Sequence, residues 1–185
     1  FDPNNLVAPA EMMELDRWAI TKLNELIEKC FKAYDDYEFH VISHEINDFC
    51  VVELSSFYLD IIKDRLYCEE KDGLERRSAQ TALYLILDGM TRMIAPILAF
   101  TSQEIWTAMP HADKDDAECV LFNDIPDWSA DLALSEEQAD KWAKVIALRD
   151  DVNKALELAR SEQGIKKNQD ADLALTFTAD AWKTF

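Results

Sequence analysis

The sequence predicts a mainly α fold, in which long amphipathic helices pack as an antiparallel bundle. The chain has 185 residues but only three glycines and five prolines. Long stretches rich in Ala, Leu, Glu and Lys separate them, and such stretches favour long helices over a sheet with many turns. A hydrophobic content of 49% is enough for a continuous core in one large domain, or in one domain and part of a second.

Three long helices are predicted in the first hundred residues. The first runs from about residue 10 to 34 and the second from 39 to 67, because apolar residues recur every three or four positions in both. These residues are Leu15, Ala19, Leu23, Leu26 and Cys30, then Ile46, Phe49, Cys50, Leu54, Phe57, Ile61 and Leu66. Gly73 marks a short polar turn, and a third helix runs from 74 until Pro96 ends it. The second and third helices are therefore antiparallel neighbours.

A further helix and an acidic loop follow. Thr101 is predicted to cap this helix with Glu104 reaching back, while Phe100 packs on Ile105. Residues 110–140 contain ten acidic residues and one lysine, so they carry −9 of the net charge of −18. We expect a long loop over 110–134, with a short extended piece at 119–122.

Two signals mark the C-terminal part of the chain. A capping box from Ser135 to Gln138 predicts a helix that runs to about residue 160 and ends at Gly164. Leu173, Leu175 and Phe177 then alternate with smaller or polar residues, which predicts a strand. A single strand needs partners, so residues 165–185 are predicted to begin a small α/β subdomain of a longer polypeptide, after a helical domain over 1–164.

Several function classes find no support. The sequence has no long apolar run and no signal peptide, so we expect a soluble, cytoplasmic protein. It has no glycine-rich phosphate loop and no G-x-S-x-G or H-E-x-x-H motif. The four cysteines lack C-x-x-C spacing, which indicates reduced structural thiols rather than a zinc site. Trp18 and Trp106 lie among apolar residues and are predicted to pack in the core.

Two histidines, four residues apart, form the only candidate metal site. His40 and His44 have a spacing that can chelate a metal ion, but no third ligand is evident. The simpler interpretation is one packed and one exposed histidine near the start of a helix.

Basic residues cluster around Gly73 in this otherwise acidic chain. They are Lys63, Arg65, Lys71, Arg76 and Arg77. One interpretation is a solvated helix surface with internal ion pairs. The other follows from position, because Arg65 and Tyr67 end one helix while Arg76 and Arg77 begin the next. These residues can then meet at one end of the bundle, where guanidinium groups bind phosphates and Tyr67 stacks on an unpaired base.

Four segments resemble a known family in their order and spacing. They are AYDDYEFH (33–40), NDFCVVELSSFYLDIIKDRLY (47–67), RRSAQTALYLIL (76–87) and MIAPILAFTSQEIW (93–106). They are similar to the anticodon-binding region of isoleucyl-tRNA synthetases, which are class I aminoacyl-tRNA synthetases. The last segment also resembles the valine, leucine and methionine enzymes. After Ile165 the sequence departs from the glycine-containing turn that this family usually has.

The resemblance implies a bundle of the class I anticodon-binding type and a tRNA partner. The candidate tRNA-binding residues are Lys63, Arg65, Tyr67, Arg76, Arg77 and Gln80. In the parent enzyme it implies ATP- and magnesium-dependent attachment of isoleucine to tRNA. The HIGH-like and KMSKS-like signatures are absent here, so this chain is expected to hold no cofactor, no metal and no catalytic residue. Its other partners would be the catalytic and C-terminal domains of the same polypeptide.

Three alternatives stay open. The first is the same domain from a valine or leucine enzyme. The second is a helical protein-interaction bundle without an RNA partner, whose charged turn is only solvated. The third is a metal-binding bundle around His40 and His44.

Overall fold

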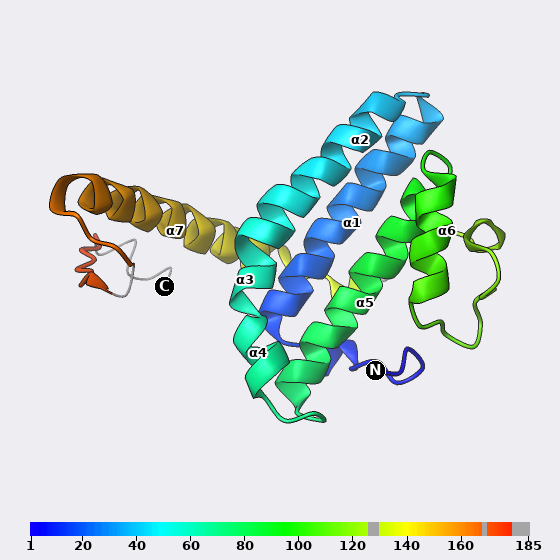
Figure 1. Ribbon diagram of the computed structural model, residues 1–185, viewed down its shortest axis with the longest axis horizontal. Helices are drawn as coiled ribbons and strands as arrows, with labels where there is room; N and C mark the ends of the chain where they lie inside the picture. The colour runs from blue at the N-terminus through cyan, green and yellow to red at the C-terminus, as the bar shows by residue number, and fades with distance from the viewer. Residues whose placement is uncertain (126–129, 168–169, 179–185) are drawn as a thin grey trace. The chain divides into compact units, whose positions relative to one another are not determined.

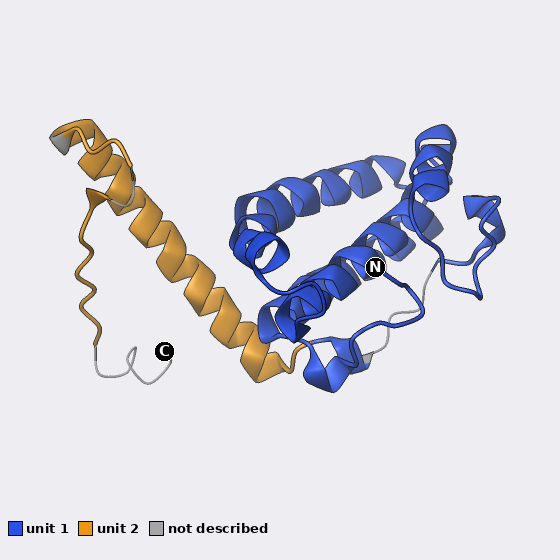
Figure 2. Ribbon diagram, turned by 60° about the horizontal axis from the view of Figure 1, so that its bottom comes forward, with its two compact units in different colours: residues 1–133 blue, residues 134–185 orange. Residues whose placement is uncertain are grey.

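The computed structural model describes residues 1–125, 130–167 and 170–178. The chain divides into two compact units, residues 1–133 and 134–185, which Figure 2 shows in separate colours. All regular elements of the described residues are helices, which confirms the mainly α prediction. Within these residues, no helix combines the length and the apolar composition that crossing a membrane requires.

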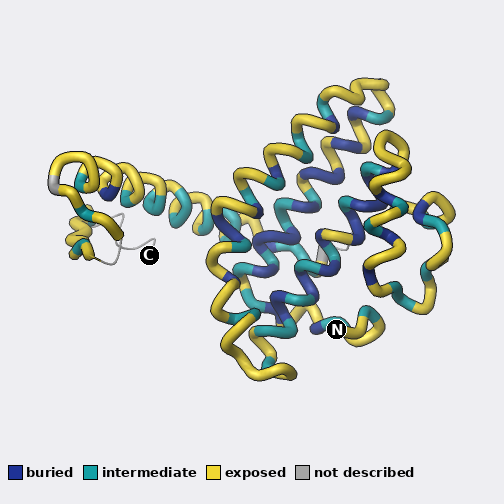
Figure 3. Tube along the Cα trace, in the orientation of Figure 1, coloured by how far each residue is buried: buried dark blue, intermediate teal, exposed yellow. Residues whose placement is uncertain are grey.

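Unit 1 is a helical bundle with three long rods (Figure 1). Its elements are the 3-10 helix η1 (Pro9–Glu11), α1 (Glu14–Asp35), α2 (Phe39–Asp48), the π-helix η2 (Phe49–Tyr58), α3 (Leu59–Ile61), α4 (Lys63–Cys68), α5 (Leu74–Ile94), α6 (Ala99–Ala108) and the 3-10 helices η3 (Val120–Phe122) and η4 (Ala130–Leu132). The rod from α2 to α4 runs antiparallel to α1 and α5, as the short turn at Gly73 predicted. Buried positions follow the length of α1 and α5 (Figure 3). Trp18 and Trp106 are fully buried, which confirms that both pack in the core.

The first helix begins later than predicted. Residues 9–11 form the separate turn η1, and α1 starts at Glu14 rather than near residue 10. Between them Met12 and Met13 are extended, with ψ angles of 141° and 144°. The amide of Met13 donates a hydrogen bond to Ser78 Oγ on α5 at 2.9 Å. A tertiary contact therefore satisfies a backbone group that a longer helix would have bonded internally.

The second rod is not one continuous α-helix. Its middle is the ten-residue π-helix η2, in which hydrogen bonds span five residues and each turn is wider. The buried residues step from Phe49 to Leu54, an interval of five that suits this geometry. The wider turns also rotate the following face: Ile61, predicted to face the core, is exposed, and Ile62 is fully buried instead.

The helix after Pro96 also differs from the prediction. α5 ends at Ile94, before Pro96, as expected, but α6 starts at Ala99, two residues before the predicted cap at Thr101. Its N-cap residue is Leu98, and no side chain caps it. Phe100 is 94% exposed, so it does not pack on Ile105. A tight turn joins α5 to α6, in which the amides of Ile97 and Leu98 both donate to the Ile94 carbonyl. This turn leads directly into α6 at Ala99, so the helix starts without a capping box.

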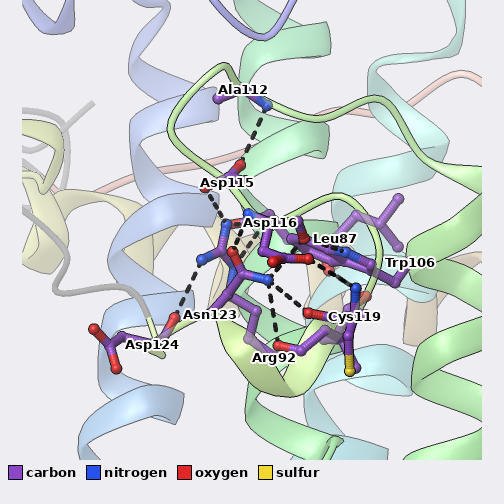
Figure 4. A network of polar contacts seen from close by, with 12 residues as sticks. Leu87, Arg92, Trp106, Ala112, Asp115, Asp116, Cys119, Asn123 and Asp124 are labelled. Atoms are coloured by element: carbon purple, nitrogen blue, oxygen red, sulfur yellow. Dashed lines mark hydrogen bonds and ion pairs between the residues drawn. The ribbon is translucent and has the colours of Figure 1, made fainter.

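The acidic segment after α6 is held in a defined conformation over residues 110–125 (Figure 4). The Arg92 guanidinium contacts Asp88 and Asp115, each at 2.9 Å, and lies over the Trp106 ring with its carbon 4.9 Å from the ring centroid. Trp106 Nε1 donates to the carbonyl of Asp116 at 3.0 Å. Residues 120–122 form η3 rather than the predicted extended piece, because Val120 inserts into the core at this point.

Unit 2 contains the helix α7 (Glu136–Gln163). The predicted capping box is present, since the Gln138 amide donates to Ser135 Oγ and the Ser135 amide donates to Gln138 Oε1. Gly164 adopts the left-handed conformation (φ 70°) that ends a helix, as predicted. The predicted strand is not formed: residues 171–178 have no regular structure, and among the described residues no strand pairs with them. The predicted boundary at residue 164 stays a prediction.

Candidate nucleic-acid interface

The turn between α4 and α5 brings two helix ends together at one end of unit 1. Gly73 donates its amide to the Glu70 carbonyl at 3.0 Å, which closes the turn. A side chain at Gly73 would place its Cβ 3.2 Å from that carbonyl oxygen, closer than most such contacts. α5 begins at the next residue, so Arg76 and Arg77 lie in its first turn. The end of α4 and the start of α5 therefore meet at this turn, as the sequence predicted.

A buried carboxylate holds this end of the bundle together. Asp16 on α1 is fully buried and accepts from both terminal nitrogens of Arg65, at 2.9 and 3.0 Å. It also accepts from the Tyr58 hydroxyl at 2.8 Å and from Ser78 Oγ. Burial and the nearby Asp16 charge raise the pKa of Tyr58, so its hydroxyl stays a proton donor. One acid therefore joins α1, η2, α4 and α5.

Arg65 is thereby given a different environment from the one expected. Its side chain is only 15% exposed and its guanidinium forms a bidentate pair with Asp16. Such a group is already occupied and is poorly placed to bind phosphate. The structure favours a positioning role for Arg65, which joins α4 to α1 through Asp16.

Arg76 and Arg77 bond to main-chain carbonyls instead of carboxylates. Arg76 donates to the Glu69 carbonyl at 3.2 Å, and Arg77 donates to the Asn5 carbonyl at 2.8 Å. The Arg76 Nε atom is buried without an acceptor in the described part of the chain. No ion pair within the described ranges includes either arginine. A guanidinium has five N–H donors, so both keep donors for an external anion.

The two arginines line a pocket of about 410 Å³. Its wall consists of Phe1, Asp2, Asn5, Lys71, Asp72, Arg76, Arg77, Gln80 and Thr81. Three cations against two acids give this wall a net charge of +1, on a chain of net charge −18. Since charge acts over about 8 Å at physiological salt, the local excess matters more for a bound anion than the total.

The N-terminal segment forms one side of this pocket. The Val7 amide donates to Thr81 Oγ1 at 3.1 Å, and the Phe1 ring lies 5.3 Å from the ring of Tyr84. Together with the bond from Arg77 to Asn5, these contacts fix residues 1–7 along α5. The pocket wall is therefore built from two segments, residues 1–5 and 71–81, that are far apart in sequence.

The structure brings together only part of the predicted site. Arg76, Arg77 and Gln80 line the pocket, and Lys71 joins them although the sequence prediction of tRNA-binding residues omitted it. Lys63 and Tyr67 lie on α4 outside the pocket wall. Lys63 pairs with Asp60 at 2.8 Å, which matches the ion-pair interpretation, and Tyr67 is 82% exposed. Lys71 could have been found from its place in the turn itself.

A second pocket, of about 400 Å³, lies between α1 and the α2–η2 rod. Its cations are already paired, Lys22 with Glu25 at 2.8 Å and Lys29 with Glu45 at 2.7 Å. Glu53 is half-buried in its wall, and burial raises the pKa of its carboxyl because desolvation disfavours the charged form. This pocket has no free cationic surface to offer a phosphate.

We predict that Glu53→Gln stabilises unit 1 near neutral pH. With a folded pKa above the unfolded one, the ionised carboxylate costs stability above the folded pKa and costs nothing below the unfolded pKa. The gain should therefore be present at pH 7 and vanish as the pH falls below about 4. Urea unfolding at both pH values measures it, with Glu45→Gln, which removes the ion pair with Lys29, as the control that shows no gain. A gain of equal size at both pH values would mean that packing rather than charge is responsible.

The metal alternative gains no support. Across the described residues no group of three or more potential ligands is suitably placed to hold a metal ion. His40 and His44 are both exposed, so the expectation that one of them packs in the core is wrong. The aromatic rings that pack where α1 leads into α2 are those of Tyr34 and Phe39, with centroids 6.0 Å apart.

The fold and the site together define a helical domain with a cluster of cationic side chains at one end of its bundle. A family model described as the anticodon-binding domain of tRNA ligase matches residues 16–175, and the chain belongs to this family. The chain is 48% identical over 182 residues to the isoleucine–tRNA ligase of Syntrophotalea carbinolica, 98% of this chain being covered. It is 44% identical to that of Geobacter sulfurreducens (95% covered) and 40% identical to that of Caldanaerobacter subterraneus (100% covered). It spans 19%, 18% and 20% of these three relatives, about a fifth of their length.

Proposed function

We propose that the pocket at the α4–α5 turn binds the anticodon stem-loop of a tRNA, within an isoleucine–tRNA ligase. The observation that carries this proposal is the state of Arg76 and Arg77. Both guanidinium groups bond to main-chain carbonyls, and no ion pair of the described residues neutralises them. They line one pocket with Lys71 and Gln80, which adds a third cation and an amide. Phosphates and unpaired bases of an RNA loop require this combination of donors.

The parent enzyme would attach isoleucine to its tRNA with ATP and magnesium bound in a region outside this chain. Family membership supports the tRNA partner, and the three ligases compared above favour isoleucine over valine or leucine. The chain itself would contribute binding energy and no catalytic group. Tyr67, exposed on α4, and Lys63 would lie beside the docked RNA as secondary contacts.

The acidic surface would narrow the ways in which RNA can dock. The excess of acidic residues in unit 1 repels a polyanion wherever no cation compensates for it, so docking on unit 1 is favoured at the α4–α5 end. The same repulsion makes the affinity of the isolated chain weak. Binding experiments therefore need low salt concentrations.

We expect Arg76→Ala and Arg77→Ala each to reduce the salt dependence of tRNA binding. Each cation that contacts a phosphate releases about one counterion from the tRNA on binding. Without that cation, the slope of the logarithm of the binding constant against the logarithm of the salt concentration should become shallower by about one. Fluorescence anisotropy of a labelled tRNA at several salt concentrations measures this slope. Lys29→Ala is the matched control, because Lys29 is an exposed cation of the same unit, paired with Glu45, near the opposite end of α1.

Three outcomes separate the alternatives. Unchanged slopes in both arginine variants would remove these residues from the interface. Equal binding of isoleucine, valine and leucine tRNAs would argue against an isoleucine-specific role for this domain. No binding of any tRNA at low salt would favour the protein-interaction bundle.

A further inference from the structure

An apolar surface lies on the far side of unit 1 from the α4–α5 turn, at the start of α6. Ile97 and Leu98, which join α5 to α6, are 42% and 51% exposed, and Phe100 in the first turn of α6 is 94% exposed. Single exposed apolar residues are common and need no explanation. Three within four positions, one of them an almost fully exposed phenylalanine, are uncommon on a surface that faces only water.

A second exposed stretch lies next to the first. In η3, Val120 is buried while Leu121 and Phe122 are 57% and 75% exposed. Gln103, one turn after Phe100 on the same face of α6, donates to the Glu118 carbonyl at 2.8 Å and accepts from the Val120 amide at 3.0 Å. These bonds place η3 beside α6, as Figure 1 also shows. Ile97, Leu98, Phe100, Leu121 and Phe122 are called the α6–η3 surface below.

The α6–η3 surface is held rigidly. Asn123 donates to the carbonyls of Cys119 and Asp116 at 2.9 and 3.0 Å, directly after Phe122, and Arg92 donates to the Asp124 carbonyl at 3.2 Å (Figure 4). Asp116 Oδ1 accepts from the Glu118 and Cys119 amides before η3. The backbone that carries Leu121 and Phe122 is therefore fixed by hydrogen bonds on either side, while Phe100 lies on the regular helix α6. Figure 3 shows the exposed colouring of this region next to buried positions of α5.

Acidic residues lie next to the surface residues along the chain. Glu104 lies one turn after Phe100 on α6, Glu118 and Asp124 lie on either side of η3 in the chain, and all three are exposed. If two copies of the chain met through this surface with twofold symmetry, each acidic edge would face its own copy, and like charges so placed are unfavourable. A partner with an apolar patch and basic edges fits better.

We propose that the α6–η3 surface is covered by the part of the ligase polypeptide that this chain does not contain. The chain spans about a fifth of the isoleucine–tRNA ligases it matches, so most of the polypeptide lies outside it. A neighbour within the same polypeptide is permanently available, and interfaces that stay formed bury more aromatic and aliphatic surface than transient ones. This inference rests on the proposed function in one respect, namely that the chain is a domain of such a ligase.

Radical footprinting of side chains tests the cover directly. The oxidation rates of Phe100 and Phe122 are compared between this chain alone and the full-length ligase without tRNA, with Tyr67 as the internal reference. Side chains that go from almost fully exposed to buried should react roughly tenfold more slowly in the full-length protein. Tyr67, which belongs to the proposed tRNA side, should react at the same rate in both. Equal rates for the phenylalanines in the two proteins would overturn the proposal.

A pair of variants tests whether the cover stabilises the ligase. Phe100→Ser combined with Phe122→Ser should leave the unfolding midpoint of this chain unchanged, because both rings are exposed in it. In the full-length ligase the same change should lower the midpoint, while the control Tyr37→Ser, which alters an exposed aromatic residue at the α1–α2 turn, should not. A concentration-dependent dimer of the chain that Phe100→Ser abolishes would assign the surface to a second copy instead. The salt dependence of tRNA binding should not change in this double variant. A failure of the tRNA proposal, which the arginine variants test, can therefore be told apart from a failure of this one.

Discussion

Replacing Asp16 with alanine should lower the free energy of unfolding of unit 1 by about 3–5 kcal/mol, the range found when one partner of a buried ion pair is removed. The variant leaves the Arg65 guanidinium at 15% exposure with no carboxylate. It also leaves the buried Tyr58 hydroxyl without its acceptor. Each of these two groups then stays buried without an acceptor, which lowers the free energy of unfolding by the cost of its desolvation. The variant also removes the acceptor through which η2, α4 and α5 are bonded to α1.

Urea unfolding followed by circular dichroism measures this effect. Two further variants show whether the loss comes from the buried ion pair. Glu25→Ala removes an exposed carboxylate from the same helix, paired with Lys22, and should change the midpoint little. Asp16→Ala combined with Arg65→Met removes both charges and should lose less than Asp16→Ala alone. A loss under about 1 kcal/mol in the single variant would show that water or another group takes over from Asp16. Arg65→Met alone should destabilise the chain without changing the salt slope of tRNA binding, if Arg65 positions the site rather than contacting RNA.

The long helices could be predicted because apolar residues recur at helical intervals in the sequence. The predicted stripe is buried from Ala19 to Cys30, with Leu15 only partly buried. α5 begins and ends where Gly73 and Pro96 indicate. The π-helix could not be predicted this way, because an α-helical period describes its apolar residues almost as well. The five-residue step from Phe49 to Leu54 and the burial of Ile62 in place of Ile61 reveal the wider turns. Helix starts that depend on distant groups, such as the Ser78 hydroxyl at Met13, are equally invisible locally.

The position of the candidate site could be predicted from the sequence, but the residues that line its pocket could not all be predicted. Two helix ends joined by a short turn must meet, so the position of Arg76 and Arg77 followed from the sequence. Which of the cations are paired with carboxylates did not follow from the sequence, because the carboxylate that binds Arg65 is 49 residues away in the chain. Lys63, by contrast, pairs with Asp60 three residues earlier, the kind of contact that helical spacing does predict. Charge pairing across helices is a property of packing, and a sequence gives it no local signal.

The second large effect is expected at Arg92. Arg92→Met should destabilise unit 1 by about 3–5 kcal/mol, because it leaves two buried carboxylates without their cation. Asp88 and Asp115 both contact the guanidinium at 2.9 Å, and the aliphatic substitute keeps much of the volume over Trp106. The loss of the bond to the Asp124 carbonyl should also release the segment after α6. Hydrogen exchange of residues 110–124 should therefore accelerate together with the fall in unfolding free energy.

The pH dependence of this loss separates charge from packing. Burial already raises the pKa of Asp88, and Arg92 opposes that rise, so the variant should raise it further. A folded pKa above the unfolded one means that ionisation destabilises the fold as the pH rises, and that the penalty is absent below the unfolded pKa. The difference between wild type and Arg92→Met should thus be largest near pH 7 and shrink toward about pH 4. Lys114→Met, which removes an exposed cation from the same segment, should show little loss at either pH. If the Arg92→Met deficit is the same at both pH values, the guanidinium acts here through its stacking on Trp106 and its volume, and the two carboxylates do not depend on it.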